Sequence, residues 1–146
     1  MSKKSMPPVK AARGQLPFYS VGGVNVVAVE DVVQGIVSAF EKGVNGQRYI
    51  LSGDNLTIQE LLTAVANAAG RAGPRYKLPG WLLQGVGGVS DFLRVDSPLN
   101  RENLKAASLY HWFDNSKARR ELDFSPGSSL EAIRSSVNWM QAQGLI

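Results

Sequence analysis

The sequence predicts a helix-rich α/β fold. Of its 146 residues 44% are apolar, and several stretches with the 3.6-residue periodicity of helices alternate with short β-rich runs. The run Tyr49–Leu51 is apolar without alternation, as in a strand buried on both faces of a parallel sheet. Thr57 with Glu60 and Ser128 with Glu131 have the spacing of capping boxes, which mark helix starts. The length fits one domain with its own core.

The N-terminal region divides into an arm and a predicted hairpin. Residues 1–14 are basic and contain Pro7 and Pro8, so we predict a flexible arm followed by a single domain over residues 15–146. The stretch 18–29 has two β-rich runs separated by Gly22 and Gly23, a dipeptide that supplies the positive φ angles of a tight turn. We therefore expect these two runs to pair with each other.

The remaining elements follow from periodicity and end signals. A helix over 30–43 starts near Asp31 and ends at Gly43, and a strand over 47–53 precedes a helix that begins after Thr57. A glycine-weakened helix over 81–95 and a helix opening at 97–98 come next. Residues 110–113 are strand-like, Ala118 and Leu122 share one face of a short helix, and the last helix runs from Ser128 to near Gly144.

Composition excludes several kinds of site. The chain has no cysteine and one histidine, so disulfides, thiolate chemistry and a histidine-rich metal site are excluded. Four basic residues of the arm account for the net charge of +4, because the other twelve basic residues balance the twelve acidic ones. Because the charge excess is confined to the arm, we expect no nucleic-acid partner. No apolar run is long enough for a bilayer span or a secretion signal, so we expect no membrane partner and a cytoplasmic location.

The chain shows no catalytic constellation. His111 has no serine, cysteine or lysine in local register, so we interpret it as a partly buried, hydrogen-bonded residue at a strand end. The stretch 85–90, "GVGGVS", ends in serine where a dinucleotide loop has its third glycine, and no strand precedes it. Each tyrosine is followed four residues later by glycine or aspartate, so no lysine lies one helical turn away to lower its pKa.

The order of these motifs resembles the C-terminal half of an extended short-chain dehydrogenase/reductase. The resemblance is to the NAD-dependent epimerase/dehydratase and dihydroflavonol-reductase-like group, and it runs from about Lys10 to the chain end. It rests on three stretches: "GGVNVVAVEDVVQGIVSAFEKG", "GQRYILSGDNLTIQELL" and "HWFDNSKARRELDFSPGSSLEAIRSSVNWM". Asp123 stands where the group usually has glycine, and Glu30 occupies a position where a charged residue is common.

The resemblance implies the C-terminal part of a Rossmann-type protein without its dinucleotide-binding half. In the intact family NAD or NADP moves a hydride and a Tyr-x-x-x-Lys pair moves the proton, but this chain has neither that pair nor the glycine-rich turn. The last Rossmann strand and helices would join a substrate-binding domain. The resemblance points to Arg13, Tyr19 and Asn25 as substrate contacts, with the open alternative that Asn25 satisfies the hairpin and Tyr19 packs.

Partners and activity follow as expectations. We expect an isolated chain that is inactive and binds neither cofactor, with a small-molecule substrate only in the intact enzyme. The alternatives are a split enzyme with a separate Rossmann subunit, an interaction module that binds a polyanion through the arm, and a start at Met1 that is not the natural one. Uncovered apolar faces around Val33, Leu62 and the Tyr49 strand predict a homo-oligomer or a missing Rossmann half.

Overall fold

The computed structural model describes residues 7–78 and 109–146, and the helices predicted over 81–95 and from 97–98, like "GVGGVS", lie outside these ranges. The fold is helix-rich α/β, as predicted. Its elements in chain order are α1 (Pro7–Ala12), β1 (Phe18–Tyr19), β2 (Gly23–Val26), α2 (Val29–Lys42), β3 (Asp54–Thr57), α3 (Ile58–Ala68), β4 (Tyr76–Lys77), α6 (Ser116–Leu122) and α7 (Ser129–Ala142).

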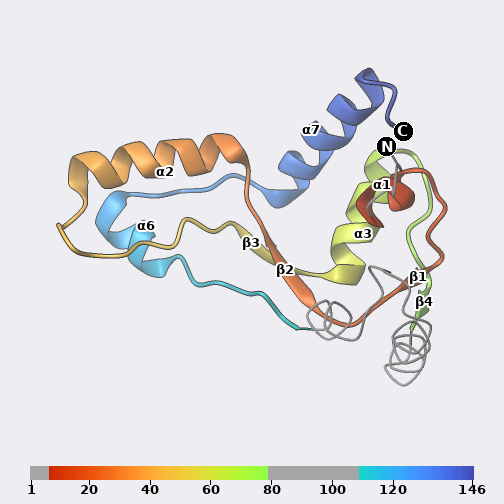
Figure 1. The fold of residues 1–146 in the computed structure, drawn as a ribbon, viewed down its shortest axis with the longest axis horizontal. Coiled ribbons are helices and arrows are strands. Elements are labelled where there is room, and N and C mark those ends of the chain that lie inside the picture. The colour runs from red at the N-terminus through yellow and green to blue at the C-terminus, as the bar shows by residue number, and fades with distance from the viewer. Residues whose placement is uncertain (1–6, 79–108) are drawn as a thin grey trace, which may run out of the picture.

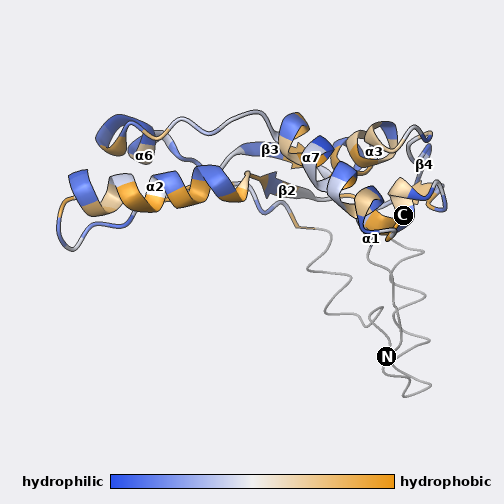
Figure 2. Ribbon diagram, turned by 90° about the horizontal axis from the view of Figure 1, so that it is seen from above, coloured by the Kyte–Doolittle hydropathy of each residue, from blue (hydrophilic) through white to orange (hydrophobic). Residues whose placement is uncertain are grey.

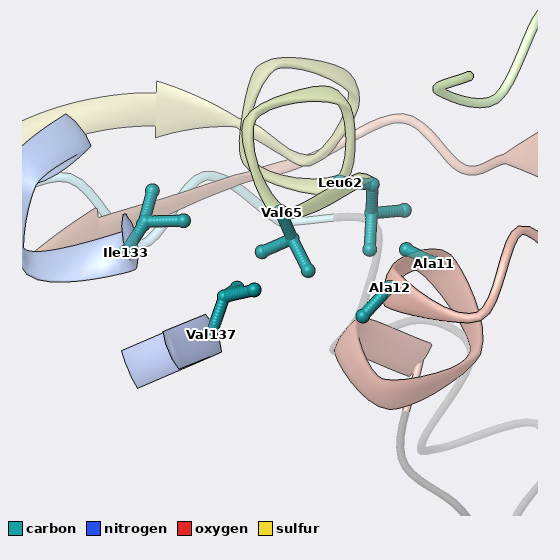
Figure 3. Close-up of a cluster of buried hydrophobic side chains, with 6 residues drawn as sticks. All are labelled: Ala11, Ala12, Leu62, Val65, Ile133 and Val137. Carbon is teal, nitrogen blue, oxygen red and sulfur yellow. The ribbon is translucent and has the colours of Figure 1, made fainter. Parts of the chain in front are cut away.

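Three helices form the main body around one apolar core. Helix α3 lies between α1 and α7, and its buried side chains Leu62 and Val65 point toward both (Figure 3). Helix α1 contributes two alanines and α7 contributes Ile133 and Val137, all at most 6% exposed. The face of α3 around Leu62, which we expected to be uncovered, is therefore closed within the chain.

The ordered structure begins earlier than the predicted boundary at residue 15. Residues 7–12 form α1, and Ala11 and Ala12 are 2% and 4% exposed against α3. The prolines stand in the first turn, where a missing backbone N–H costs nothing, and the two alanines are small enough for close helix contact. Residues 7–12 are thus helical and packed, where we predicted a flexible arm.

The predicted hairpin is wrong. Strand β1 pairs in parallel with β4, whereas β2 pairs antiparallel with β3 in a register that aligns Gly23 with Thr57 and Val26 with Asp54. Gly22 does adopt a positive φ of 128°, but the turn redirects the chain from one sheet to the other instead of folding it back. The glycine turn permits either a hairpin or a passage from one sheet to the other, and pairing with distant strands decided for the second.

A second, smaller cluster lies at the other end of the molecule, where α2 and α6 lie together (Figure 1). Ala118 and Leu122 of α6 are fully buried, and Phe124 is 5% exposed. Tyr49 and Leu51 pack against them. Gly35 of α2 gives the closest approach, because a Cβ at this position would lie 2.8 Å from a methyl group of Leu51.

Side-chain caps mark the starts of α3 and α7 but not that of α2. Thr57 and Glu60 form the predicted capping box, with the Thr57 side chain accepting from the Glu60 N–H and the Glu60 carboxylate accepting from the Thr57 N–H at 2.7 Å. The same bond lowers the pKa of Glu60. Ser128 caps α7 by accepting from the N–H of Leu130, and not through the capping box that we predicted with Glu131. Helix α2 has no side-chain cap at Ala28.

Candidate functional site

Arg13 and Tyr19 lie in different surroundings. Arg13 is exposed and its guanidinium donates to the carbonyl of Leu145 at 2.5 Å, which ties the end of α1 to the C-terminus. Tyr19 is half-buried on β1 and packs against the main core. Among the residues that the structure describes, no hydrogen bond joins any two of Arg13, Tyr19 and Asn25, and the Tyr19 hydroxyl makes none.

Asn25 joins β2 to β3. Its side-chain oxygen accepts from the N–H of Gly53 at 2.9 Å, and its amide nitrogen donates to the Gly53 carbonyl at 3.0 Å and to Asn55 Oδ1 at 2.8 Å. Asn55 in turn donates to the carbonyl of Phe113 and accepts from its N–H. The two asparagines thus tie three segments of the chain together, and Asn25 bonds to residues of and beside β3, not within the predicted hairpin.

Half-exposed aromatic rings cover the start of β2. Tyr110 and Trp112 stack edge to face with ring centroids 4.9 Å apart. A Cβ on Gly23 would lie 2.2 Å from the indole nitrogen of Trp112, so only glycine fits beneath this pair. His111 donates its backbone N–H to the Gly23 carbonyl at 2.8 Å, and its side chain is exposed instead of partly buried as we expected.

The ionised groups near this segment have structural partners. The backbone N–H and hydroxyl of Ser116 donate to the carboxylate of Asp114, and the backbone bond is the first cause of the lowered pKa of Asp114. Lys42 and Asp123 form a surface ion pair at 2.7 Å. Among residues 7–78 and 109–146, no group of three or more His, Cys, Asp or Glu side chains is arranged to hold a metal ion.

The outer face of α2 is an exposed apolar ridge. It consists of large side chains that recur every three or four residues and are 50% to 89% exposed, namely Val29, Val33, Ile36, Val37 and Phe40. Apolar residues recur along this helix in Figure 2. The opposite side of the helix, at Gly35 and Ala39, packs on the smaller cluster. The side chains of the ridge therefore take no part in the packing of α2 on the smaller cluster.

The segment that we predicted as the buried strand is extended but belongs to no ladder. The backbone N–H and C=O groups of residues 48–51 make no hydrogen bond within the described part of the chain. Tyr49 and Leu51 face the smaller cluster, while Ile50 is 48% exposed. The next hydrogen bonds are at the carbonyl of Ser52, which accepts from Asn115, and at Gly53.

A hollow of about 670 Å³ opens between the start of α2 and helices α3 and α7. Its walls are mostly apolar, including Val27, Val65 and Met140, with Glu30 and two serines of α7 as polar members. Trp139 lies on its wall and is 60% exposed. Sequence reasoning missed this hollow, because its walls come from α2, α3 and α7, which lie far apart in the chain.

The sequence matches no protein-family model but matches two curated proteins. Sterol demethylase protein B of Methylococcus capsulatus is 29% identical over 141 residues, which cover 92% of this chain and 43% of that protein. A candidate dihydroflavonol 4-reductase of Synechocystis sp. is 30% identical over 144 residues, covering 92% of this chain and 41% of that protein. Both matches run through nearly the whole chain.

Solved structures agree with this relationship. The gox2253 crystal structure has a TM-score of 0.78 at 31% identity and is matched over 95% of this chain and 43% of its own. The chain is homologous to the C-terminal part of an extended short-chain dehydrogenase/reductase. A nucleoside-diphosphate-sugar epimerase from Pseudomonas aeruginosa shares the fold of this chain, with a TM-score of 0.76 at 22% identity. The match covers 96% of this chain and 42% of the epimerase.

The chain spans less than half the length of these relatives. The exposed ridge of α2 and residues 48–51 lie in the part of the molecule that contains the smaller cluster. Few of the described residues in this part are buried. No helix in the described ranges is long and apolar enough to cross a membrane.

Proposed function

We propose that the chain is the substrate-binding half of an NAD(P)-dependent reductase or sugar epimerase. The observation that carries the proposal is the match over nearly the whole chain to 41–43% of proteins named as a sterol demethylase component and a dihydroflavonol 4-reductase. Solved structures of the same fold include a nucleoside-diphosphate-sugar epimerase from Pseudomonas aeruginosa and a UDP-glucuronic acid 4-epimerase from Bacillus cereus in complex with NAD, which support the second substrate class. The cytoplasm is the proposed location.

The strand-to-helix turns in the described part of the chain do not fit a nicotinamide cofactor. Phosphate binding at a strand-to-helix turn needs glycines that let backbone N–H groups approach the pyrophosphate. The turn from β2 to α2 consists of Val27 and Ala28, and β3 passes directly into α3 at Thr57. Neither turn contains glycine. We therefore propose that NAD or NADP is bound by the part of the enzyme that corresponds to the rest of the relatives' length.

The chain's own contribution is to shape the space for the substrate. The mostly apolar hollow beside Trp139 has a volume in the usual range for small-molecule sites, which supports a role in holding a carbon skeleton. Arg13, Tyr19 and Asn25 remain proposed substrate contacts. Arg13 and Asn25 would have to share bonds that they already make, whereas the Tyr19 hydroxyl has no partner to give up within the described residues.

Cofactor titration of two proteins tests this proposal. One is the chain alone, and the other is a chimera in which the chain replaces the matched stretch of the Synechocystis protein. Nicotinamide fluorescence should report saturable binding of NADH or NADPH by the chimera and none by the chain. The chimera should also oxidise the reduced cofactor with a carbonyl compound from a panel of dihydroflavonols, ketosteroids and ketosugars.

Two results would contradict the proposal. Saturable micromolar binding of NADH by the isolated chain would place a cofactor site in it. A chimera that binds the cofactor but reduces nothing, while the unaltered Synechocystis protein reduces a member of the panel, would remove the substrate-binding role.

A further inference from the structure

We propose that Asn45 is a site of spontaneous modification, at which the backbone nitrogen of Gly46 displaces the side-chain amide and leaves an isoaspartate that loosens the turn after α2. Asn45 with Gly46 is the one place in the sequence where asparagine precedes glycine. The site lies between α2 and the extended segment of residues 48–51, and it does not depend on the proposed function.

Asn45 and Gly46 are the two central residues of a hydrogen-bonded turn. The N–H of Gln47 donates to the carbonyl of Val44 at 3.1 Å, which closes four residues into the turn. Gly46 has a φ of 79°, as the third residue of a type II turn does, and both central residues are exposed. A Cβ on Gly46 would meet no atom of the described residues within 4 Å, its chain neighbours aside. The centre of the turn can therefore move without displacing other parts of the molecule.

The two reacting groups of this turn are not held by hydrogen bonds. Within residues 7–78 and 109–146, neither the side-chain amide of Asn45 nor the backbone N–H of Gly46 has a hydrogen-bond partner. Glycine has no side chain to shield its nitrogen, and its backbone is free enough to bring that nitrogen to Cγ of the preceding residue. Because both groups belong to adjacent residues, the attack is intramolecular and has the rate advantage of a reacting pair held close together.

The reaction needs only water besides the chain itself. The nitrogen of Gly46 forms a bond to Cγ of Asn45, its proton passes to the departing Nδ2 group, and ammonia leaves as the Cγ–Nδ2 bond breaks. The product is a five-membered succinimide ring. Water then adds to one of the two ring carbonyl carbons. Addition at Cγ gives aspartate, whereas addition at the main-chain carbon gives isoaspartate, in which the main chain runs through the former side chain.

Asn115 also precedes a small residue, but there the structure holds both groups. Its side-chain nitrogen donates to the carbonyl of Ser52, and its side-chain oxygen accepts from Nε of Arg119 at 2.9 Å. The backbone N–H of Ser116 donates to the carboxylate of Asp114 at 2.9 Å. Attack on Asn115 requires these bonds to break first. The folded structure should therefore protect this asparagine and leave the one in the turn after α2 reactive.

An isoaspartate in the turn changes the length of chain between two anchored ends. At one end the N–H of Val44 donates to the hydroxyl of Tyr49 at 3.1 Å, and at the other Nζ of Lys117 donates to the side-chain oxygen of Gln47 at 2.6 Å. The isoaspartate adds one carbon atom to the main chain between these ends and one negative charge. The turn that fits both contacts now is then no longer the geometry of the chain, so we expect the contact at Val44 to be lost.

Ageing of the full chain at mildly alkaline pH tests the site. Peptide mapping by mass spectrometry locates each converted asparagine, and an isoaspartyl-specific methyltransferase measures the isoaspartate formed. In the folded chain Asn45 should convert at least about tenfold faster than Asn115, because the second pair is held away from attack geometry. In urea Asn115 should become reactive as well. Asn45→Gln is the matched variant, since it keeps an exposed amide but requires a larger ring, and it should remove the isoaspartate signal.

Two results would overturn the site. If Asn45 stays intact in the folded chain but converts in urea, the turn protects it. If Asn45 and Asn115 convert at equal rates in the folded chain, the hydrogen bonds described above do not select between them.

Hydrogen exchange tests the loosened turn. The amide of Val44 should exchange at least about tenfold faster in the aged chain than in the fresh one, because an amide without a stable bond opens at almost no cost in free energy. Asn45→Asp carries the new charge on a main chain of normal length, so it should leave this exchange rate unchanged. An aged chain that is rich in isoaspartate but exchanges at Val44 like the fresh chain would contradict the loosening of the turn.

Discussion

Replacement of Asn25 by alanine separates a structural role from a substrate-binding one. The side chain makes three hydrogen bonds, two to the backbone of Gly53 and one to Asn55. Alanine removes all three and leaves the N–H and C=O of Gly53, a half-buried residue, without these partners. If the contacts are structural, the substitution should lower the free energy of unfolding of the isolated chain.

The expected loss is about 2 kcal/mol. A typical hydrogen bond contributes about 0.5–1.5 kcal/mol net, which gives a range of about 1.5–4.5 kcal/mol for three bonds. Asn25 and Gly53 are only half-buried, so water can replace part of what is lost and the lower half of the range applies. Against a total stability of about 5–15 kcal/mol, this is a readily measured change.

Urea unfolding followed by circular dichroism measures it. The midpoint should fall while the slope stays constant, which identifies a change of stability and not of the unfolded state. Asn138→Ala, on the exposed face of α7, is the matched control and should stay within about 0.5 kcal/mol of the parent. If Asn25→Ala behaves like this control and raises only the KM of the chimera, the structural argument for Asn25 is refuted.

Three further predictions follow from the same structure. Gly23→Ala should cost about 1–3 kcal/mol, because the new methyl group collides with the ring of Trp112, and a change in tryptophan fluorescence should accompany the loss. Ala11→Asp should cost at least about 2 kcal/mol, since a charge would enter the core between α1 and α3; an unchanged urea midpoint would mean that α1 does not pack. The Ser116 N–H lowers the folded-state pKa of Asp114 below its ordinary value of 3.8, so its contribution to stability is present above that pH and is lost as the pH falls through the lowered pKa. Asp114→Asn should flatten this acid-side loss in urea midpoints measured from pH 6 to pH 2.5, and an unchanged profile would contradict the assignment.

Local sequence signals predicted helices α2, α3, α6 and α7. Thr57 with Glu60 encodes a capping box that needs only residues three apart, and Ala118 with Leu122 encodes one face of a single helix. Such interactions close within a few residues, so the sequence around them is sufficient. The same is true of the absence of a Tyr-x-x-x-Lys pair, which is a property of the sequence itself.

The pairing of strands required contacts between distant residues. Gly22 and Gly23 permit a hairpin, yet the backbone of β2 meets β3 about thirty residues later, where Asn25 bonds to Gly53 and Asn55. Likewise, the apolar run Tyr49–Leu51 predicted burial, but burial of Ile50 needs a layer that this chain does not provide. The contacts of the candidate site residues could not be predicted for the same reason. Arg13 and Asn25 were chosen by resemblance, and the residues to which they bond lie far along the chain.

The sequence by itself determined the helix-rich α/β class, the main helix starts and the lack of an acid/base pair, because each depends on residue types or on neighbours within one helical turn. Only the tertiary structure decided that residues 7–12 join the core, that Leu62 is covered while Phe40 is not, and that Asn25 ties β2 to β3. An apolar stripe predicts that a helix face will be buried, and the positions of the other elements decide whether it is.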